Sequence, residues 1–487
     1  MEESSPVPSP LWTARRVRIT FGLLLAVFVA AIDSSVVSTA VPTIAGQLGH
    51  FSLYPWLIAG YLLTSTTTVP LWGRLADIYG RRRVLLAGLA WFLAASVLCG
   101  SAPDMVWLIT FRVLQGMAAG CLLPVALTTI GDLFTLEQRA RMMGIFTSVW
   151  AVSALVGPAV GAGFLATIGW RWIFWINVPV LIGSGALLWV HRDAPPAERR
   201  GRLDYLGALT LTAGVALALL GLEEGSWPLV GLGVATLVVF AVLQRGAANP
   251  TIPMALLRHP VIGPATAAVF FAGTLMFALN AFIPLYVQGV LGGSAFVAGG
   301  TLSLAALGWS GMAVVSGRLL LRFGYQPLVV SGAATLVLGA AGLALQPAGT
   351  GIPWVAAFAL LMGMGMGQLQ TPLLVVSQSV VDWSSRGTTT ALNQFSRSIG
   401  GAIGVPLLGA LLTARSQALA AAQGLDPAMM ANPLSRTGHL DAGTAGLIGG
   451  GLQAVFWVLL GVAVATLMIS AAILALRRRT APPTTAT

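Results

Sequence analysis

The fold is decided by one short polar stretch, Gly73-Arg74-Leu75-Ala76-Asp77-Ile78-Tyr79-Gly80-Arg81-Arg82-Arg83. It joins two apolar runs, residues 56–72 and 84–102, each of which is long enough to enter a membrane as a helix. Glycine lets the backbone reverse tightly and lets two helices approach closely. Arginine accumulates in the loops on the cytoplasmic side of a membrane. The stretch therefore predicts a tight cytoplasmic turn between two membrane helices.

The composition excludes a soluble protein. The 487 residues are 56% hydrophobic and only 8% charged, which is too little charge to cover a soluble surface. Apolar runs of about 20 residues, the length that crosses a bilayer as a helix, recur along the chain. The net charge of +11 comes from arginines that stand singly or in short clusters between these runs. This spacing indicates membrane topology and no nucleic-acid partner.

The apolar runs predict an all-α polytopic membrane protein with fourteen transmembrane helices. They are arranged as six, two and six, so that two related bundles flank a central linker. The predicted parts are a cytoplasmic tail at 1–18, a six-helix bundle at 19–190, a linker with two extra helices at 191–260, a second six-helix bundle at 261–476 and a cytoplasmic tail at 477–487.

The distribution of arginine supports this topology. With both termini in the cytoplasm, 22 of the 26 basic residues fall in inner segments, and only Arg171, Arg415 and Arg436 fall outside. This count places Arg397 in an inner segment, because the next apolar run begins at residue 399. The predicted location is the cytoplasmic (inner) membrane of a bacterium, with several passes.

Two charges fall inside the first six spans. Asp33 lies about 21 Å along the first helix, and Arg112 lies about 10 Å below the outer surface on the fourth, at 1.5 Å per residue. Because a lone charge in hydrocarbon costs several kcal/mol, we expect the two side chains to pair. The opposing effects of burial and a neighbouring arginine can leave a carboxyl group able to exchange a proton near neutral pH. The alternative is a static ion pair that fastens two helices together.

Small residues follow one another on the predicted fifth span. Gly157, Pro158 and Gly161 have near-helical spacing, which lets a neighbouring helix come close, and proline removes one backbone hydrogen bond and bends a helix. Simple tight packing would explain the same residues. A fainter copy of the opening stretch, residues 317–324, follows the second span of the later block but has no Asp. This repeat indicates two related halves that can rock around a central cavity.

Several of these motifs together resemble a known family. The pattern G-x-L-x-D-x-x-G-R-R-R resembles the loop between helices two and three of the major facilitator superfamily. The segments 112–116, 157–163 and 170–179 are similar to its motifs on helices four, five and six. Residues 33–42 look like the helix-one motif of its fourteen-helix drug:proton antiporters.

The resemblance implies an exporter that works by alternating access. It would exchange protons for lipophilic or amphipathic drugs or antibiotics, expected to be cationic, with Asp33 and Arg112 in proton coupling. A gating motif would comprise Gly73, Asp77, Gly80, Arg81 and Arg82, with Asp77 meeting a helix N-terminus at the inner gate. Gly157, Pro158 and Gly161 would form the antiporter motif.

A mixed aromatic and polar surface is a candidate for substrate binding, since promiscuous pockets combine such side chains. Packing against other helices or lipid is the alternative for each residue. The candidates are Tyr61, Thr64, Gln115, Phe271, Phe277, Asn280 and Gln368.

The chain contains no lysine, so it has no phosphate-binding P-loop. We therefore expect no enzymatic activity, no nucleotide, and neither a cofactor nor a metal, and we expect a monomer in the bilayer that handles a small-molecule substrate and protons. Two alternatives keep the fold but change the role. One is an exporter of lipids or lipid precursors, and the other is a transport-dead sensor or scaffold.

Overall fold

The computed structural model describes residues 13–48, 55–189, 204–223, 225–247, 250, 252, 254–293, 295–347, 350–425 and 442–480. These residues form helices and connecting turns, without a strand among them. The first part contains α1 (Ala14–Leu48), α2 (Pro55–Thr67), α3 (Val69–Tyr79), α4 (Arg81–Gly100), α5 (Met105–Leu133), α6 (Leu136–Thr167), α7 (Trp172–Trp175) and α8 (Asn177–Trp189). The middle part contains α9 (Tyr205–Glu223), α10 (Trp227–Gly246) and α11 (Met254–Arg258). The last part contains α12 (Ile262–Leu285), the π-helix η2 (Tyr286–Val290), α13 (Ala295–Phe323), α14 (Tyr325–Ala344), α15 (Ile352–Ser379), the 3-10 helix η3 (Trp383–Ser385), α16 (Arg386–Ala422) and α17 (Ala442–Thr480).

Ten helical segments among the described residues are long and apolar enough to cross a membrane. They confirm the prediction of an all-α polytopic membrane protein. The helices α1, α6 and α9, and α2 together with α3, occupy the remaining predicted spans. The count of fourteen spans stays a prediction.

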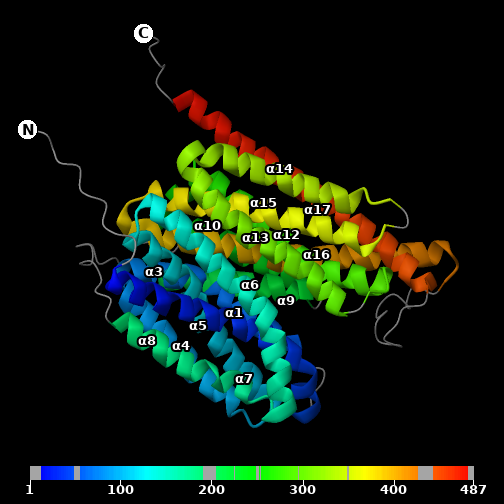
Figure 1. The fold of residues 1–487 in the computed structure, drawn as a ribbon, viewed down its shortest axis with the longest axis horizontal. Coiled ribbons are helices and arrows are strands. Elements are labelled where there is room, and N and C mark those ends of the chain that lie inside the picture. The colour runs from blue at the N-terminus through cyan, green and yellow to red at the C-terminus, as the bar shows by residue number, and fades with distance from the viewer. Residues whose placement is uncertain are drawn as a thin grey trace, which may run out of the picture.

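The described residues form four apolar clusters, and the two largest underlie the two bundles. One is built from residues of α12 to α17 and includes Leu275, Leu336 and Phe456. Another is built mainly from α1, α4, α5 and α8 and contains Leu89 and Phe92. Figure 1 shows α14 and α17 along one long side of the molecule and α4, α7 and α8 along the opposite side. Between these two sides lie six further helices, α3, α5, α6, α13, α15 and α16 (Figure 1).

Contacts between the two bundles run along two sides. On one side α6 packs against α13, and on the other α16 packs against α3 and α5. Glycine permits both approaches: a Cβ atom on Gly144 of α6 would lie 2.4 Å from Cγ2 of Val314 on α13. The helices α9 and α10 pack against each other, and α9 also contacts α2 and α16.

The faint repeat in the sequence has a structural counterpart. Gly80 separates α3 from α4 with a φ of 92°, and Gly324 separates α13 from α14 with a φ of 75°. Both values lie in the left-handed region that favours glycine. At the position equivalent to Asp77, however, the later copy carries the apolar Leu321. Any contact that Asp77 makes through its carboxylate is therefore peculiar to the first half.

The helix that contains the apolar run from residue 399 is longer than that run, because α16 already begins at Arg386. The first turns of α16 carry Thr388, Thr389 and Thr390, which are polar yet buried against other helices. Arg397 consequently lies inside a membrane helix, about 16 Å from its start at 1.5 Å per residue, instead of in an inner segment.

Candidate functional site

The two predicted intramembrane charges form an ion pair. Nη1 of Arg112 on α5 lies 2.6 Å from Oδ2 of Asp33 on α1. Each residue is only 1% exposed, so the pair is shielded from both lipid and water. The contact expected from the depths of the two residues is therefore present.

Three neutral polar side chains complete a network around this pair. The amide of Gln115 donates to Oδ1 of Asp33 at 3.1 Å, and the amide of Asn177 donates to the same oxygen at 3.0 Å. The Gln115 amide also donates to the hydroxyl of Ser96 at 2.9 Å, and its oxygen accepts from Arg112 at 2.7 Å. The carboxylate thus accepts three hydrogen bonds, one from a charged donor and two from amide donors.

The guanidinium of Arg112 has further partners. Its Nε donates to the backbone oxygen of Leu57 at 3.3 Å. The ring of Tyr61 lies 4.1 Å from its central carbon and the ring of Phe174 lies 5.8 Å away, both within cation–π range. Arg112 therefore keeps several interactions even when Asp33 is neutral.

A second cluster closes one end of the molecule across the two bundles. The carboxylate of Asp77, in the last turns of α3, receives the backbone N–H groups of Gly387 at 2.9 Å and Thr388 at 2.7 Å. The hydroxyl of Thr388 donates to it at 2.7 Å. These groups are at the N-terminus of α16, where free N–H groups and the helix dipole favour an anion. The expected meeting of Asp77 with a helix N-terminus is present.

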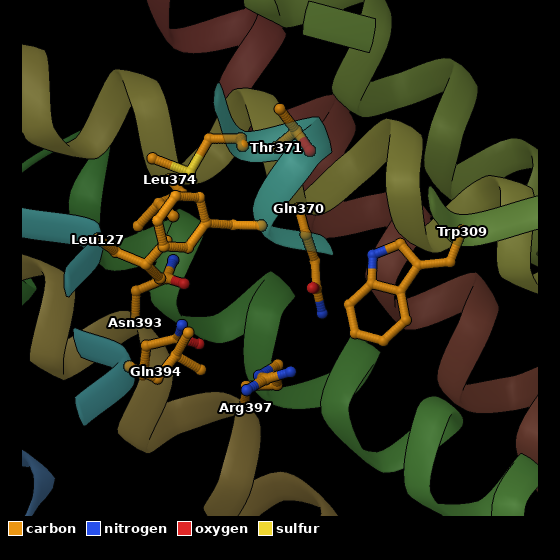
Figure 2. A pocket seen from close by; sticks show the side chains of 11 residues that line it. Leu127, Trp309, Gln370, Thr371, Leu374, Asn393, Gln394 and Arg397 are labelled. Carbon is orange, nitrogen blue, oxygen red and sulfur yellow. The ribbon is translucent and has the colours of Figure 1, made fainter. Parts of the chain in front are cut away.

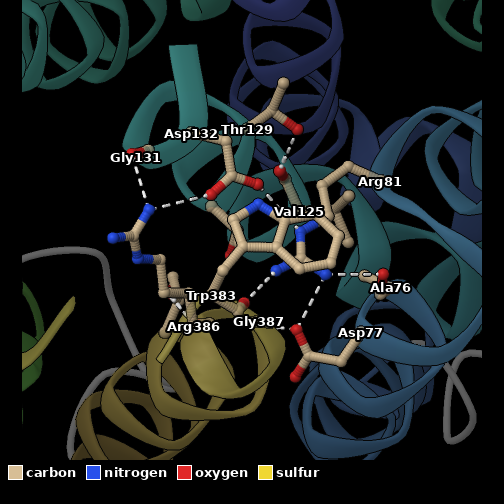
Figure 3. A network of polar contacts seen from close by, with 12 residues as sticks. Ala76, Asp77, Arg81, Val125, Thr129, Gly131, Asp132, Trp383, Arg386 and Gly387 are labelled. Carbon is tan, nitrogen blue, oxygen red and sulfur yellow. Dashed lines mark hydrogen bonds and ion pairs between the residues drawn. The ribbon is translucent and has the colours of Figure 1, made fainter. Parts of the chain in front are cut away.

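Arg81 extends this cluster in both directions (Figure 3). Its side chain lies 2.8 Å from Asp77 and 3.1 Å from Asp132 at the end of α5, and it donates to the backbone oxygen of Trp383 at 3.0 Å. Asp132 also lies 3.3 Å from Arg386 of the other bundle. Together Asp77, Arg81, Asp132, Trp383, Arg386, Gly387 and Thr388 form what we call the inner clamp.

The other residues of the gating motif surround the inner clamp. Gly80 supplies the left-handed turn, and the guanidinium of Arg82 stacks 4.9 Å from the ring of Trp189. Gly73 lies at the crossing of α3 with α16: a Cβ atom there would be 2.3 Å from Cβ of Ala391 and 2.8 Å from the backbone oxygen of Gly387. Only glycine fits this crossing without displacing a helix.

Replacing Gly73 with Ala is expected to lower thermal stability. The added methyl group meets backbone and Cβ atoms of α16, so overpacking should cost about 1–3 kcal/mol. The measurement is the midpoint of thermal unfolding of the purified protein. Gly185→Ala is the control, because a Cβ atom on Gly185 has nothing within 4 Å. Equal midpoints for the two variants would contradict this account of the crossing.

Between the bundles, next to the inner clamp, lies a cavity of about 70 Å³. Figure 2 shows that its polar side chains come from α15 and α16 and that the ring of Trp309 stands at one side. Its lining residues are Leu123, Leu127, Met143, Phe146, Trp309, Gln370, Thr371, Leu374, Asn393, Gln394 and Arg397.

The residues expected to bind substrate lie elsewhere, and none of them lines this cavity. Tyr61 and Gln115 belong to the ion-pair network, and the hydroxyl of Thr64 donates to the backbone of α5 at Val113. On the last part of the chain, Gln368 donates to Ser331 and the exposed Asn280 donates to the backbone of Met276. Phe271 and Phe277 are half-buried on α12. Their role in substrate binding stays a prediction.

The predicted antiporter motif lies on α6. Gly157 and Gly161 are buried there, and α6 packs against α1 and α13. The side chain of Pro158 lies outside the described residues. The motif thus belongs to a helix that contacts both bundles, where small residues permit close approach of the neighbouring helices.

Several functional candidates were missed by sequence reasoning. Asn177 and Ser96 join the ion-pair network, Asp132 and Arg386 join the inner clamp, and Arg397 faces the cavity. For Asn177 a signal existed, since it is a polar residue close to the start of an apolar run. For the other four residues, the spacing in the sequence does not indicate which side chain each one contacts. These residues are Ser96, Asp132, Arg386 and Arg397.

Comparison with known proteins agrees with the fold described above. The model of the family described as Major Facilitator Superfamily matches residues 23–405. The chain is 35% identical over 415 residues to the multidrug transporter protein MdtP of Bacillus subtilis (strain 168), covering 83% of this chain and 76% of that protein. It is 33% identical over 407 residues to multidrug resistance protein 3 of the same organism, covering 81% and 79%.

A solved structure shares the fold. The crystal structure of the human organic anion transporter MFSD10 (TETRAN) superposes with a TM-score of 0.68 over 94% of this chain and 100% of that one. The sequences are only 14% identical, so this likeness shows the fold alone.

Proposed function

Because the chain belongs to the major facilitator superfamily, we propose that it exports lipophilic small molecules in exchange for protons, with Asp33 as the proton-carrying group. Relatives named as multidrug transporters cover most of its length and support drug-like cargo. Those relatives favour drugs over the lipid cargo of the first alternative. The complete inner clamp and ion pair speak against a transport-dead sensor or scaffold.

The buried Asp33–Arg112 pair is the observation that carries the proposal. A buried ion pair is a poor way to stabilise a fold, since apolar residues of similar volume do as well or better. If the pair only fastened α1 to α5, removing both charges would therefore change the free energy of folding little. An ionisable carboxylate at membrane depth is instead typical of ion and proton pathways.

We infer a coupling cycle from the partners of the pair. When a proton reaches Asp33, the carboxylate loses its charge and its attraction for Arg112 weakens. Arg112 retains Leu57 and Tyr61 as partners, so the pair can open without leaving the guanidinium unpaired. Because α1 and α5 both contact α6, which packs on α13, movement at the pair can reach the interface between the bundles.

The inner clamp supplies the gate in this proposal. It joins α3 and α5 to the start of α16, so it must break before the central cavity can open at that end. By the distribution of arginine, that end faces the cytoplasm. We therefore propose a monomer in the cytoplasmic membrane of a bacterium, with both termini inside.

The proposed function is tested in inverted membrane vesicles whose lumen has been acidified. A compound that is exported should enter the lumen and drive protons out, which a pH-sensitive dye reports as recovery of fluorescence. The panel should include anionic, neutral and cationic lipophilic compounds, and vesicles without the protein serve as the control. Accumulation of a compound without proton release would contradict the coupling, and absence of any accumulation would contradict export.

A further inference from the structure

We propose that the cavity between the bundles binds the negatively charged group of an amphipathic anion through Arg397. This inference rests on the proposed function, because it names the class of substrate that the exporter would carry. It replaces the expectation of a cationic substrate.

The charge of Arg397 has no counter-ion within the described part of the chain. The residue lies in the first third of α16 and lines the cavity, and its Nε is buried without a hydrogen-bond acceptor. The side chain forms no ion pair with any residue that the structure describes. The helices from α12 to α17 contain neither Asp nor Glu. The bundle to which Arg397 belongs therefore offers it no counter-ion within a membrane span. A half-buried, unpaired guanidinium between membrane helices is costly unless a ligand supplies the negative charge.

Among the side chains that the structure describes, the other bundle does not neutralise Arg397 either. Its described acids at membrane depth and in the inner clamp are already engaged: Asp33 with Arg112, Asp77 with Arg81, and Asp132 with Arg81 and Arg386. None of the cavity-lining residues is acidic. The cavity therefore carries one positive charge and no negative one.

Neighbouring side chains offer additional donors. The Nε2 of Gln370 on α15 is buried without a partner, and Figure 2 shows its amide directed towards the side chain of Arg397. Asn393 and Gln394, one turn before Arg397, make no side-chain hydrogen bond within the described part of the chain. A carboxylate has two acceptor oxygens and suits a planar guanidinium with an amide beside it.

The rest of the lining suits an apolar body. Leu123, Leu127, Met143 and Phe146 face the cavity from the first bundle, and Trp309 and Leu374 face it from the second. A volume of about 70 Å³ holds a charged group and a few carbon atoms, which is less than the 300–1,000 Å³ of typical ligand pockets. The anionic group would thus be anchored at Arg397 while the apolar part extends between the bundles.

The test uses three fluorescent compounds with one pyrene body and different charges: a carboxylate, its methyl ester and a trimethylammonium analogue. Binding to the full-length protein in non-ionic detergent is measured by anisotropy. We expect the carboxylate to bind at least about tenfold more tightly than the ammonium compound, because hydrogen bonds to charged groups are the strong ones. Arg397→Gln should reduce this ratio to about one, and Arg397→Lys should preserve its direction.

Arg415→Gln is the matched control, since Arg415 is exposed on the same helix and far along it from the cavity. It should bind all three compounds as the wild type does. Equal binding of the three compounds by the wild type, or tighter binding of the ammonium compound, would overturn the inference. This wild-type series stays decisive even if Arg397→Gln does not fold.

The assay needs no proton gradient, so it is independent of coupling. Preference for the carboxylate together with absence of proton release in vesicles would retain the anion site and overturn the proposed function. Proton-driven export of cations alone, without preference for the carboxylate in the binding assay, would retain the proposed function and overturn the anion site.

Discussion

Replacing Asp33 with Asn is expected to reduce proton-driven export to the level of vesicles without the protein, while the protein still folds and still binds substrate. Asn has nearly the shape of Asp and its oxygen can accept from Arg112, and the guanidinium keeps Gln115 and Leu57 as acceptors. The side chain cannot, however, gain and lose a proton. Folding is checked by elution as a single species in gel filtration, and export by dye recovery in acidified vesicles.

Asp104→Asn is the matched control for this substitution. Asp104 is the N-cap of α5 and accepts from the backbone N–H of Trp107, a role that Asn fills equally well. This variant should export as the wild type does. Unchanged export by Asp33→Asn would remove the carboxylate from the mechanism, and a protein that fails to fold would assign the pair to stability.

Replacing Asp77 with Asn is expected to open the inner clamp. The carboxylate receives three hydrogen bonds from the start of α16 and an ion pair from Arg81, and hydrogen bonds to charged groups contribute about 1.5–3 kcal/mol each. The oxygen of an Asn amide can accept some of these hydrogen bonds. Its two N–H groups, however, would face the N–H and O–H donors at the start of α16. Loss of even one such interaction should lower the ratio of closed to open molecules about tenfold or more.

The distance between spin labels measures this shift. Labels replace Tyr79 on α3 and Ser379 on α15, both exposed at the inner end, in a background in which Cys99 and Cys121 are changed to Ala. The Asp77→Asn protein should populate a longer distance than the parent. Asp382→Asn is the control, since the Asp382 side chain makes no cap hydrogen bond at the same end. Identical distance distributions for the parent and Asp77→Asn would refute the clamp.

Parts of the site that follow from local sequence could be predicted. The opening stretch combines an acid, two glycines and a run of arginines in one turn. The structure places Asp77 and Arg81 in the inner clamp, with Gly73, Gly80 and Arg82 beside it. Asp33 and Arg112 could be paired because the rise per residue fixes their depth and hydrocarbon leaves each charge few other partners.

Parts that depend on contacts between distant helices could not be predicted. Asp132 and Arg386 come together from α5 and α16 only because the bundles close at that end. The start of α16 was missed because its residues are polar, and apolar length was the signal used for spans. Those residues face other helices rather than lipid, so the helix needs no apolar run there. Arg397 was placed outside the membrane for the same reason.

The central claim is that Asp33 carries the exchanged proton. The most direct measurement uses purified protein in a weakly buffered solution that contains a pH-indicator dye. The pH is followed while a compound that the protein binds is added to a saturating concentration. The account predicts that the wild type changes its bound protons on binding and that Asp33→Asn binds the same compound with no change. A proton signal of equal size in both proteins would contradict the account.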